Sequence, residues 1–187
     1  MRRVHLPRTL QELWALFSKE KSFALYGGGT DLLVKARSGL PLPETLICIE
    51  RIEEMKAVRE EADHVFIGSA ATHRALLSNP VVQRHFPVLV SSLLSLGSPP
   101  IRNMGTIGGN ICTASPAGDT LPALYVLQGE VELRSPDGSR RMSLHQFISG
   151  PGKTDLRPQE ILYGLWVRKD QGFATHHFEK VGQRKAL

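Results

Sequence analysis

The sequence predicts an α+β fold built from two α/β subdomains. Strand-like and helix-like patterns alternate over residues 2–50, and hairpin patterns become frequent after Met55. The 187 residues are 41% hydrophobic and 22% charged, which is typical of a globular chain with a core. We place the boundary between a smaller subdomain, residues 1–53, and a larger one, residues 54–187, where the pattern changes.

The smaller subdomain is predicted to contain three strands separated by two helices. Thr9, followed three positions later by Glu12, is typical of a helix N-cap. Thr30 or Asp31 can cap the second, shorter helix, and Gly39 can end it in a left-handed conformation. The strands are expected at residues 3–6, 23–25 and 45–50.

The larger subdomain is predicted to be rich in strands. A turn signal at residues 135–138, with glycine where a positive φ is needed, separates two strand-like runs. Strands are expected at residues 56–60, 64–68, 130–134, 140–143, 160–167 and 173–180, and helices at residues 72–78, 88–96 and 121–127.

Composition and charge disfavour several classes of protein. Cys48 and Cys112 have no second thiol nearby in sequence, so we expect no disulfide framework, no iron–sulfur cluster and a reducing, cytoplasmic location. No apolar stretch has the length of a signal peptide or of a membrane span. The net charge is +5, but the basic residues are scattered in pairs, which indicates a solvated surface rather than a nucleic-acid-binding face.

A first glycine cluster, GGGTD at residues 27–31, joins a predicted strand to a predicted helix. Backbone N–H groups at such a turn can face an anion, and glycine lets a phosphate approach without a Cβ in the way. A tight turn without a ligand explains the cluster equally well. The Rossmann spacing G-x-G-x-x-G fails at Leu32 and the P-loop pattern has no match, so both motifs are disfavoured.

A second glycine-rich segment covers residues 105–118. It gathers hydroxyl, amide and carboxylate side chains around a flexible glycine core, at Thr106, Asn110, Thr113, Ser115 and Asp119. Such a set suits a pyrophosphate, ribose hydroxyls and an adenine edge. A plain surface loop is the alternative, but a loop of this length in a compact domain is usually functional or disordered, and this one has too many apolar residues for disorder.

Three segments together resemble a known family. They are GGGTDLL at residues 27–33, RNMGTIGGNICTASPAGD at residues 102–119 and FEKVGQR at residues 178–184. In order and separation they resemble the FAD-binding domain of molybdopterin-dependent dehydrogenases, including xanthine dehydrogenase and the medium subunit of carbon monoxide dehydrogenase. The resemblance covers essentially the whole chain, and it implies a PCMH-type fold in which two glycine loops hold the FAD pyrophosphate from opposite sides of a cleft.

The resemblance also implies the residues of the site. The first loop would consist of Gly27, Gly28, Gly29, Thr30 and Asp31, and the second would contribute Thr106, Gly109, Asn110, Thr113 and Asp119. Asp119 would lie near the ribose or the adenine. No metal ligand and no catalytic residue is implied in this chain.

Two further positions match family residues near the flavin. Leu162 matches a residue that packs on the flavin side, and Lys180 matches a cation near the ring, which would raise the potential of the flavin. The residues alone favour plainer interpretations as well. Leu162 fits a core strand, Lys180 fits a surface charge, and Tyr26 fits the core at a strand end better than ring stacking.

The implied function is electron transfer within a molybdenum hydroxylase. A molybdopterin-binding large subunit would hydroxylate the substrate, a 2Fe-2S small subunit would relay electrons, and this flavin subunit would pass them to NAD or another acceptor. Two alternatives remain, a stand-alone flavin oxidoreductase and a flavin-free scaffold or nucleic-acid-binding protein. Only 6% of the residues are aromatic, which argues against binding of single-stranded nucleic acid by base stacking. Family members continue beyond residues 178–184, so we expect this chain to lack their usual C-terminal domain.

Overall fold

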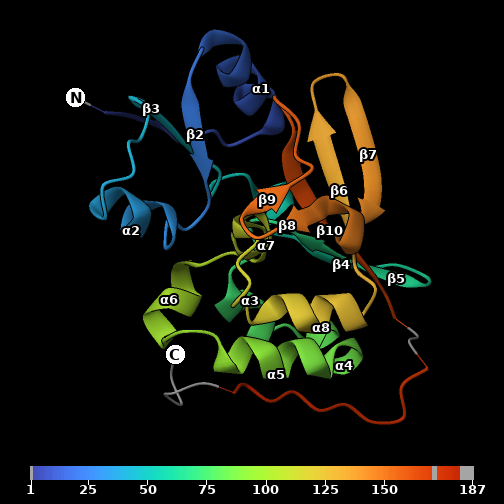
Figure 1. Cartoon of the computed structure of the whole chain (residues 1–187). Coiled ribbons are helices and arrows are strands. Elements are labelled where there is room, and N and C mark those ends of the chain that lie inside the picture. Colours follow the sequence, from blue (N-terminus) through green and yellow to red (C-terminus); the bar gives the residue numbers. More distant parts are fainter. Residues whose placement is uncertain (1, 170–171, 182–187) are drawn as a thin grey trace.

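The computed structural model describes residues 2–169 and 172–181 (Figure 1). The strands are β1 (Arg3–His5), β2 (Phe23–Tyr26), β3 (Thr45–Cys48), β4 (Val58–Glu60), β5 (His64–Gly68), β6 (Glu130–Ser135), β7 (Gly138–Ser143), β8 (Ile148–Gly150), β9 (Lys153–Thr154) and β10 (Ile161–Arg168). The helices are α1 (Leu10–Lys19), α2 (Leu32–Arg37), α3 (His73–Leu77), α4 (Pro80–His85), α5 (Pro87–Ser95), α6 (Pro99–Met104), α7 (Ile107–Thr113), α8 (Thr120–Val126) and α9 (Leu144–Phe147), with a 3₁₀ turn at Glu53–Met55.

The strands form separate sheets, which confirms the predicted α+β class. A parallel sheet has the order β1-β3-β2, and an antiparallel sheet has the order β4-β5-β10-β6-β7. The short pair β8-β9 forms a third sheet of its own. The strands up to Cys48 belong to the parallel sheet, and the strands of the antiparallel sheet begin at Val58. This change is compatible with the boundary expected near residue 53, which stays a prediction.

Helix α1 forms where the sequence predicts it. The Thr9 hydroxyl accepts a hydrogen bond from the Glu12 amide at 3.2 Å, and the Glu12 carboxylate accepts one from the Arg8 amide at 2.8 Å. The apolar side chains of Leu10, Leu13 and Phe17 recur at helical spacing and are buried. They pack into one hydrophobic cluster with β3 and with one face of the larger sheet, so α1 joins the two sheets.

Strand β10 alternates between the two faces of the larger sheet. Leu162 and Leu165 point into the core between the larger sheet and the helices, whereas Tyr163 and Trp166 belong to the cluster around α1. The register shifts between Leu162 and Gly164, which accommodates the residue between them as a bulge. A Cβ on Gly164 would lie 2.4 Å from the Phe66 ring, so glycine is required there by close packing.

Helices α5 and α8 run side by side below the larger sheet (Figure 1). The core there contains Phe86, Leu89 and Leu124, none of which is exposed, together with apolar residues of β5, β6 and β10. The strand expected at residues 173–180 does not form; this segment is extended and lies outside any sheet. It passes below the helices, and Phe178 packs against the core. Residues 182–184 of the third family-like segment lie outside the described residues.

Several helices were not predicted from the sequence, among them α4 and α6. Proline occupies the first turn of both, where its missing N–H is not needed, as it also does in α5, which was expected at residues 88–96. Asn79 additionally caps α4 by accepting hydrogen bonds from the amides of Val81 and Val82. Helices α4 and α6 have six residues each, which is too short for an apolar period to be recognised.

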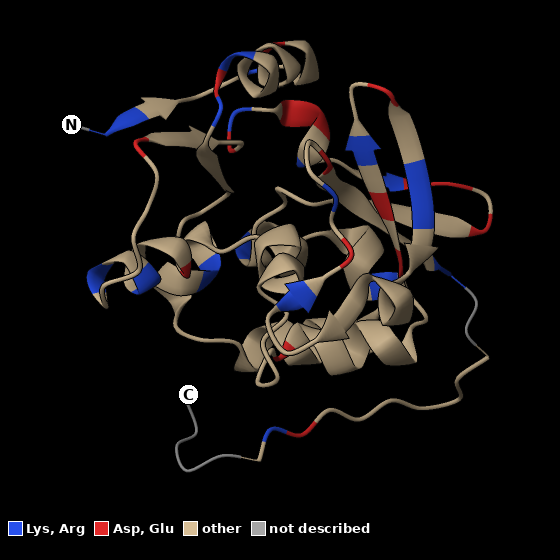
Figure 2. Ribbon diagram, turned by 45° about the horizontal axis from the view of Figure 1, so that its top comes forward, with Lys and Arg blue, Asp and Glu red and all other residues tan. Residues whose placement is uncertain are grey.

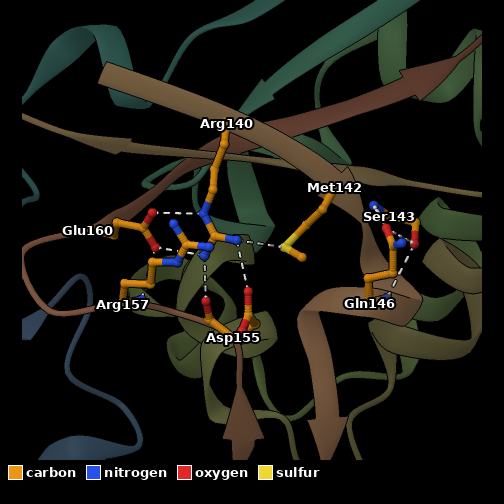
Figure 3. Close-up of polar contacts among 7 residues, drawn as sticks. All are labelled: Arg140, Met142, Ser143, Gln146, Asp155, Arg157 and Glu160. Carbon is orange, nitrogen blue, oxygen red and sulfur yellow. Dashed lines mark hydrogen bonds and ion pairs between the residues drawn. The ribbon is translucent and has the colours of Figure 1, made fainter. Parts of the chain in front are cut away.

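A cluster of charges fixes the β8-β9 region against β7 (Figure 3). Arg140 on β7 donates from Nε and Nη2 to the two carboxylate oxygens of Glu160, both at 2.8 Å, and from Nη1 to Asp155 at 2.8 Å. The Arg157 amide donates to the same Glu160 side chain. The Arg140 guanidinium holds the pKa of Glu160 below its ordinary value. The loop before β10 is therefore anchored at its end.

Charged residues are spread over strands, helices and loops in the drawn molecule (Figure 2). Among residues 2–169 and 172–181, no helix combines the length and the apolar composition that crossing a membrane requires.

We predict that Glu160→Gln lowers the free energy of unfolding at neutral pH by about 1–3 kcal/mol, because hydrogen bonds to a charged partner contribute roughly this much. The folded-state pKa of Glu160 is depressed, so its contribution is present above the unfolded value near 4.5 and is lost as the pH falls below it. Urea unfolding of both proteins from pH 7 to pH 3 measures this.

The matched control is Glu130→Gln, since Glu130 is exposed at the start of β6 and forms no ion pair with another described residue. A difference between wild type and Glu160→Gln that does not change between pH 7 and pH 3 would contradict the prediction.

Candidate functional site

The two glycine-rich segments lie directly against each other. A Cβ placed on Gly28 would lie 1.6 Å from the carbonyl oxygen of Met104, and one on Gly27 would lie 2.8 Å from Oγ1 of Thr106. No side chain fits at Gly28 without moving backbone. These glycines are therefore required by the packing of the two segments, in addition to any role toward a ligand.

The first segment leaves several backbone donors unused. Within the described part of the chain, the amides of Gly28, Gly29, Thr30 and Asp31 donate no backbone hydrogen bond. Gly29 is buried and has φ +70°, a left-handed conformation that other residues rarely adopt. Asp31 stands at the N-cap of α2 but forms no side-chain cap. Successive free amides of this kind are suited to binding an anion.

The middle of the second segment is helix α7, Ile107–Thr113, and not the flexible loop that the sequence predicted. Thr106 caps α7 by accepting a hydrogen bond from the Gly109 amide at 3.1 Å. The amides of Ile107 and Gly108 donate to the carbonyl oxygens of Ala71 and Ser69. Because its first amides are already bonded, α7 contributes side chains and a smooth glycine surface to the site rather than free backbone donors.

Two side chains of α7 are held in place by partners outside the helix. The buried Thr120 hydroxyl donates to Oδ1 of Asn110, which leaves the amide nitrogen of Asn110 available as a donor. The Thr113 hydroxyl donates to Asp31 at 3.3 Å, and Asp31 pairs with Lys35 at 2.7 Å. The pair formed by Thr113 and Asp31 links the two segments across 82 positions of sequence.

Both segments line one pocket of about 480 Å³, within the usual range for small-molecule sites. Its lining includes ten of the twelve residues expected from the sequence, namely Gly27, Gly28, Gly29, Thr30, Asp31, Thr106, Gly109, Asn110, Thr113 and Asp119. The structure thus brings these ten residues together.

Leu162 does not line this pocket. It is 4% exposed, pairs with Leu133 on the neighbouring strand β6 and belongs to the core between the larger sheet and the helices. Its position agrees with the plain interpretation of an apolar strand residue.

Lys180 lies beside the pocket rather than in its lining. Its Nζ atom is 2.9 Å from Oδ2 of Asp119 and 3.5 Å from the carbonyl oxygen of Ser95. Asp119 lines the pocket from the other side of this ion pair. Lys180 is therefore an ion-paired residue, and its contact with the pocket lining is the ion pair with Asp119.

Sequence reasoning missed other residues of the pocket lining. Tyr26, interpreted as core, lines the pocket, and burial and the neighbouring Cys48 thiol raise its pKa to about 12. Burial likewise raises the pKa of the Cys112 thiol to about 12, so the phenol and this thiol both stay protonated at neutral pH. His73 and Leu96 also line the pocket. Both lie between the two glycine segments in the sequence, where no motif indicated them.

Comparison with known proteins decides the family. The family described as the FAD binding domain in molybdopterin dehydrogenase matches residues 1–167. The chain belongs to this family. FAD is accordingly the cofactor of the domain.

Relatives show the same assignment. The nicotinate dehydrogenase FAD-subunit of Eubacterium barkeri is 33% identical over 186 residues, which are 97% of this chain and 63% of that protein. The carbon monoxide dehydrogenase medium chain of Hydrogenophaga pseudoflava is 35% identical over 165 residues, 87% of this chain and 57% of that protein. The chain thus spans about three fifths of the length of these relatives.

A solved structure shows the same fold. The structure of carbon monoxide dehydrogenase from Hydrogenophaga pseudoflava, in a form that lacks the Mo-pyranopterin moiety of its molybdenum cofactor, superimposes with a TM-score of 0.91. The superposition has 30% sequence identity and covers 99% of this chain and 65% of that chain. The PCMH-type FAD-binding fold expected from the sequence is confirmed.

We predict that Gly109→Val weakens FAD binding at least ~100-fold, because an added side chain would enter the pocket, where glycine surfaces let phosphates approach. Gly109 is exposed, and only Oγ1 of Thr106 lies within 4 Å of an added Cβ, at 2.9 Å. Displacing this capping hydroxyl costs about 1 kcal/mol, which leaves the domain folded. Calorimetric titration with FAD and circular dichroism measure the two effects.

The control is Gly150→Val on β8, where an added Cβ meets nothing within 4 Å and which does not line the pocket. Retention of wild-type FAD affinity by Gly109→Val would show that this side of the pocket does not receive the phosphates.

Proposed function

We propose that this chain holds FAD in the pocket between its two glycine-rich segments and transfers electrons as the flavin component of a molybdenum hydroxylase of the xanthine dehydrogenase type. The observation that carries the proposal is the pocket itself. Unused amides of one segment face the same space as hydroxyl and amide side chains of the other, in a chain of the FAD-binding family.

The residues of the pocket fit a dinucleotide. The free amides of residues 28–31 can donate to phosphate oxygens, as can the Asn110 amide nitrogen. The Asp119 carboxylate can accept from ribose hydroxyls while Lys180 balances its charge. The protonated Tyr26 phenol and Cys112 thiol add no negative charge near the phosphates.

FAD supplies the redox chemistry, and the protein supplies binding and electrostatics. The chain's own part is to fix the dinucleotide, exclude water around it and place charges beside it. Lys35 lines the pocket, and its ammonium group pairs with Asp31, so the negative charge of that carboxylate is balanced beside the free amides.

The rest of the electron path is assigned to other chains. Two cysteines cannot supply the four ligands of an iron–sulfur cluster. We therefore propose a 2Fe-2S small subunit as the electron donor, a molybdopterin-binding large subunit as the site of substrate oxidation, and NAD as an acceptor. The names of the relatives, an FAD-subunit and a medium chain of dehydrogenases, support the presence of further subunits.

We predict that the chain binds FAD at least ~100-fold more tightly than FMN. FMN lacks the diphosphate link and the adenosine, and losing two charge-assisted hydrogen bonds of about 1.5–3 kcal/mol each corresponds to roughly that factor in Kd. Flavin fluorescence titrations of the apoprotein measure both constants. Equal affinities, or no response to FAD, would contradict the proposed site.

We predict further that the FAD-loaded chain does not turn over an organic substrate alone. Turnover of nicotinate, a purine or carbon monoxide is expected only after molybdenum and iron–sulfur subunits from the native host are added. The loss of visible flavin absorbance after each candidate substrate is added, with and without these subunits, measures reduction of the flavin. Rapid bleaching by a substrate with the chain alone would favour a stand-alone flavin oxidoreductase.

A further inference from the structure

A buried histidine forms one wall of the pocket. His73 is 2% exposed, begins helix α3 and lines the pocket. Its amide donates to the carbonyl oxygen of Gly105 at 2.9 Å, and a Cβ on Gly105 would lie 3.0 Å from the imidazole Cδ2. The ring is thus held edge-on against the backbone that precedes α7.

The imidazole has no hydrogen-bond partner among residues 2–169 and 172–181. Nδ1 of His73 is buried without a hydrogen bond, and no hydrogen bond joins Nε2 to another described residue. Burial, with Arg102 nearby, lowers the pKa of His73 to about 4. The ring is therefore neutral at physiological pH and has one donor and one acceptor nitrogen. A buried polar group without a partner destabilises the fold, which makes this histidine costly unless a ligand satisfies it.

The surroundings of His73 differ from those of the free amides. Leu96, Ile101 and Gly105 line the pocket beside it and offer apolar surface. The cation that acts on His73, Arg102, is itself engaged, since its Nη1 donates to the carbonyl oxygens of Leu96 and Gly97 at 2.9 and 3.0 Å. This corner suits a flat, neutral heteroaromatic ring with a polar edge and does not suit a phosphate.

We propose that His73 hydrogen-bonds the polar edge of the adenine base of FAD and makes the pocket selective for an adenine nucleotide. FAD carries one adenine and one diphosphate, which match the apolar corner and the free amides respectively. The inference rests on the proposed placement of FAD in this pocket. His73 is a specificity-determining residue, and it takes no part in electron transfer.

The test uses His73→Leu and equilibrium binding of FAD, ADP, IDP and FMN to the full chain. IDP replaces the 6-amino group of adenine by an oxo group and so reverses the hydrogen-bonding pattern at that edge. We expect His73→Leu to weaken FAD and ADP about tenfold, to abolish the preference for ADP over IDP, and to leave FMN binding unchanged.

The variant also gives a readout that a structural histidine would not give. Replacing an unsatisfied imidazole with leucine should leave the melting temperature of the apoprotein unchanged or raise it by a few degrees. His73→Gln, which keeps an amide near one ring nitrogen, should recover part of the affinity. His85→Leu on α4, a histidine outside the pocket lining, is the matched control.

The outcomes separate this inference from the proposed function. Wild-type affinities and ADP preference in His73→Leu, with FAD still bound by the wild type, would overturn only the role of His73. A lower melting temperature with equal losses for FAD and FMN would also overturn it, because that pattern indicates a structural role. Failure of the wild-type chain to bind FAD would overturn the proposed function and this inference together.

Discussion

The site depends on a backbone contact between Gly28 and Met104. There is no room for a Cβ at Gly28, so the first glycine segment can reach the second only because glycine stands there. The contact joins the edge of the parallel sheet to the segment between α6 and α7. If this approach were wider by the size of a methyl group, the free amides of residues 28–31 and the side chains of α7 would no longer share one space.

Much of this arrangement follows from local sequence signals, and some of it does not. Alternation and turn residues predict the two hairpins of the larger sheet, and a threonine cap predicts α1. Helix α7 was missed because glycine at positions 108 and 109 has low helix propensity. A Cβ on Gly108 would lie 2.4 Å from that of Ser69, so tertiary packing selects glycine there. The strand expected at residues 173–180 failed because its neighbours are helices rather than a free sheet edge.

Ten pocket residues could be predicted because they belong to two contiguous motifs, whereas His73 could not. Nothing in the sequence distinguishes a buried histidine that lacks a partner from one that has found one. The same holds for Thr120, whose importance lies in a hydrogen bond to Asn110 that only the packing of α8 on α7 creates. The cost of an unsatisfied polar group at the pocket is offset elsewhere in the fold, by the hydrogen bonds of the Arg140 cluster and by the apolar packing on both faces of the larger sheet.

Asp119 belongs to two regions at once. One side of its carboxylate lines the pocket, while the other holds Lys180 and, with it, the extended segment that carries Phe178 onto the helical core. A substitution of Asp119 therefore removes a pocket group and unpairs a lysine in the same step. Its phenotype cannot be assigned to either loss by itself, and only a double-mutant cycle with Lys180 separates the two contributions.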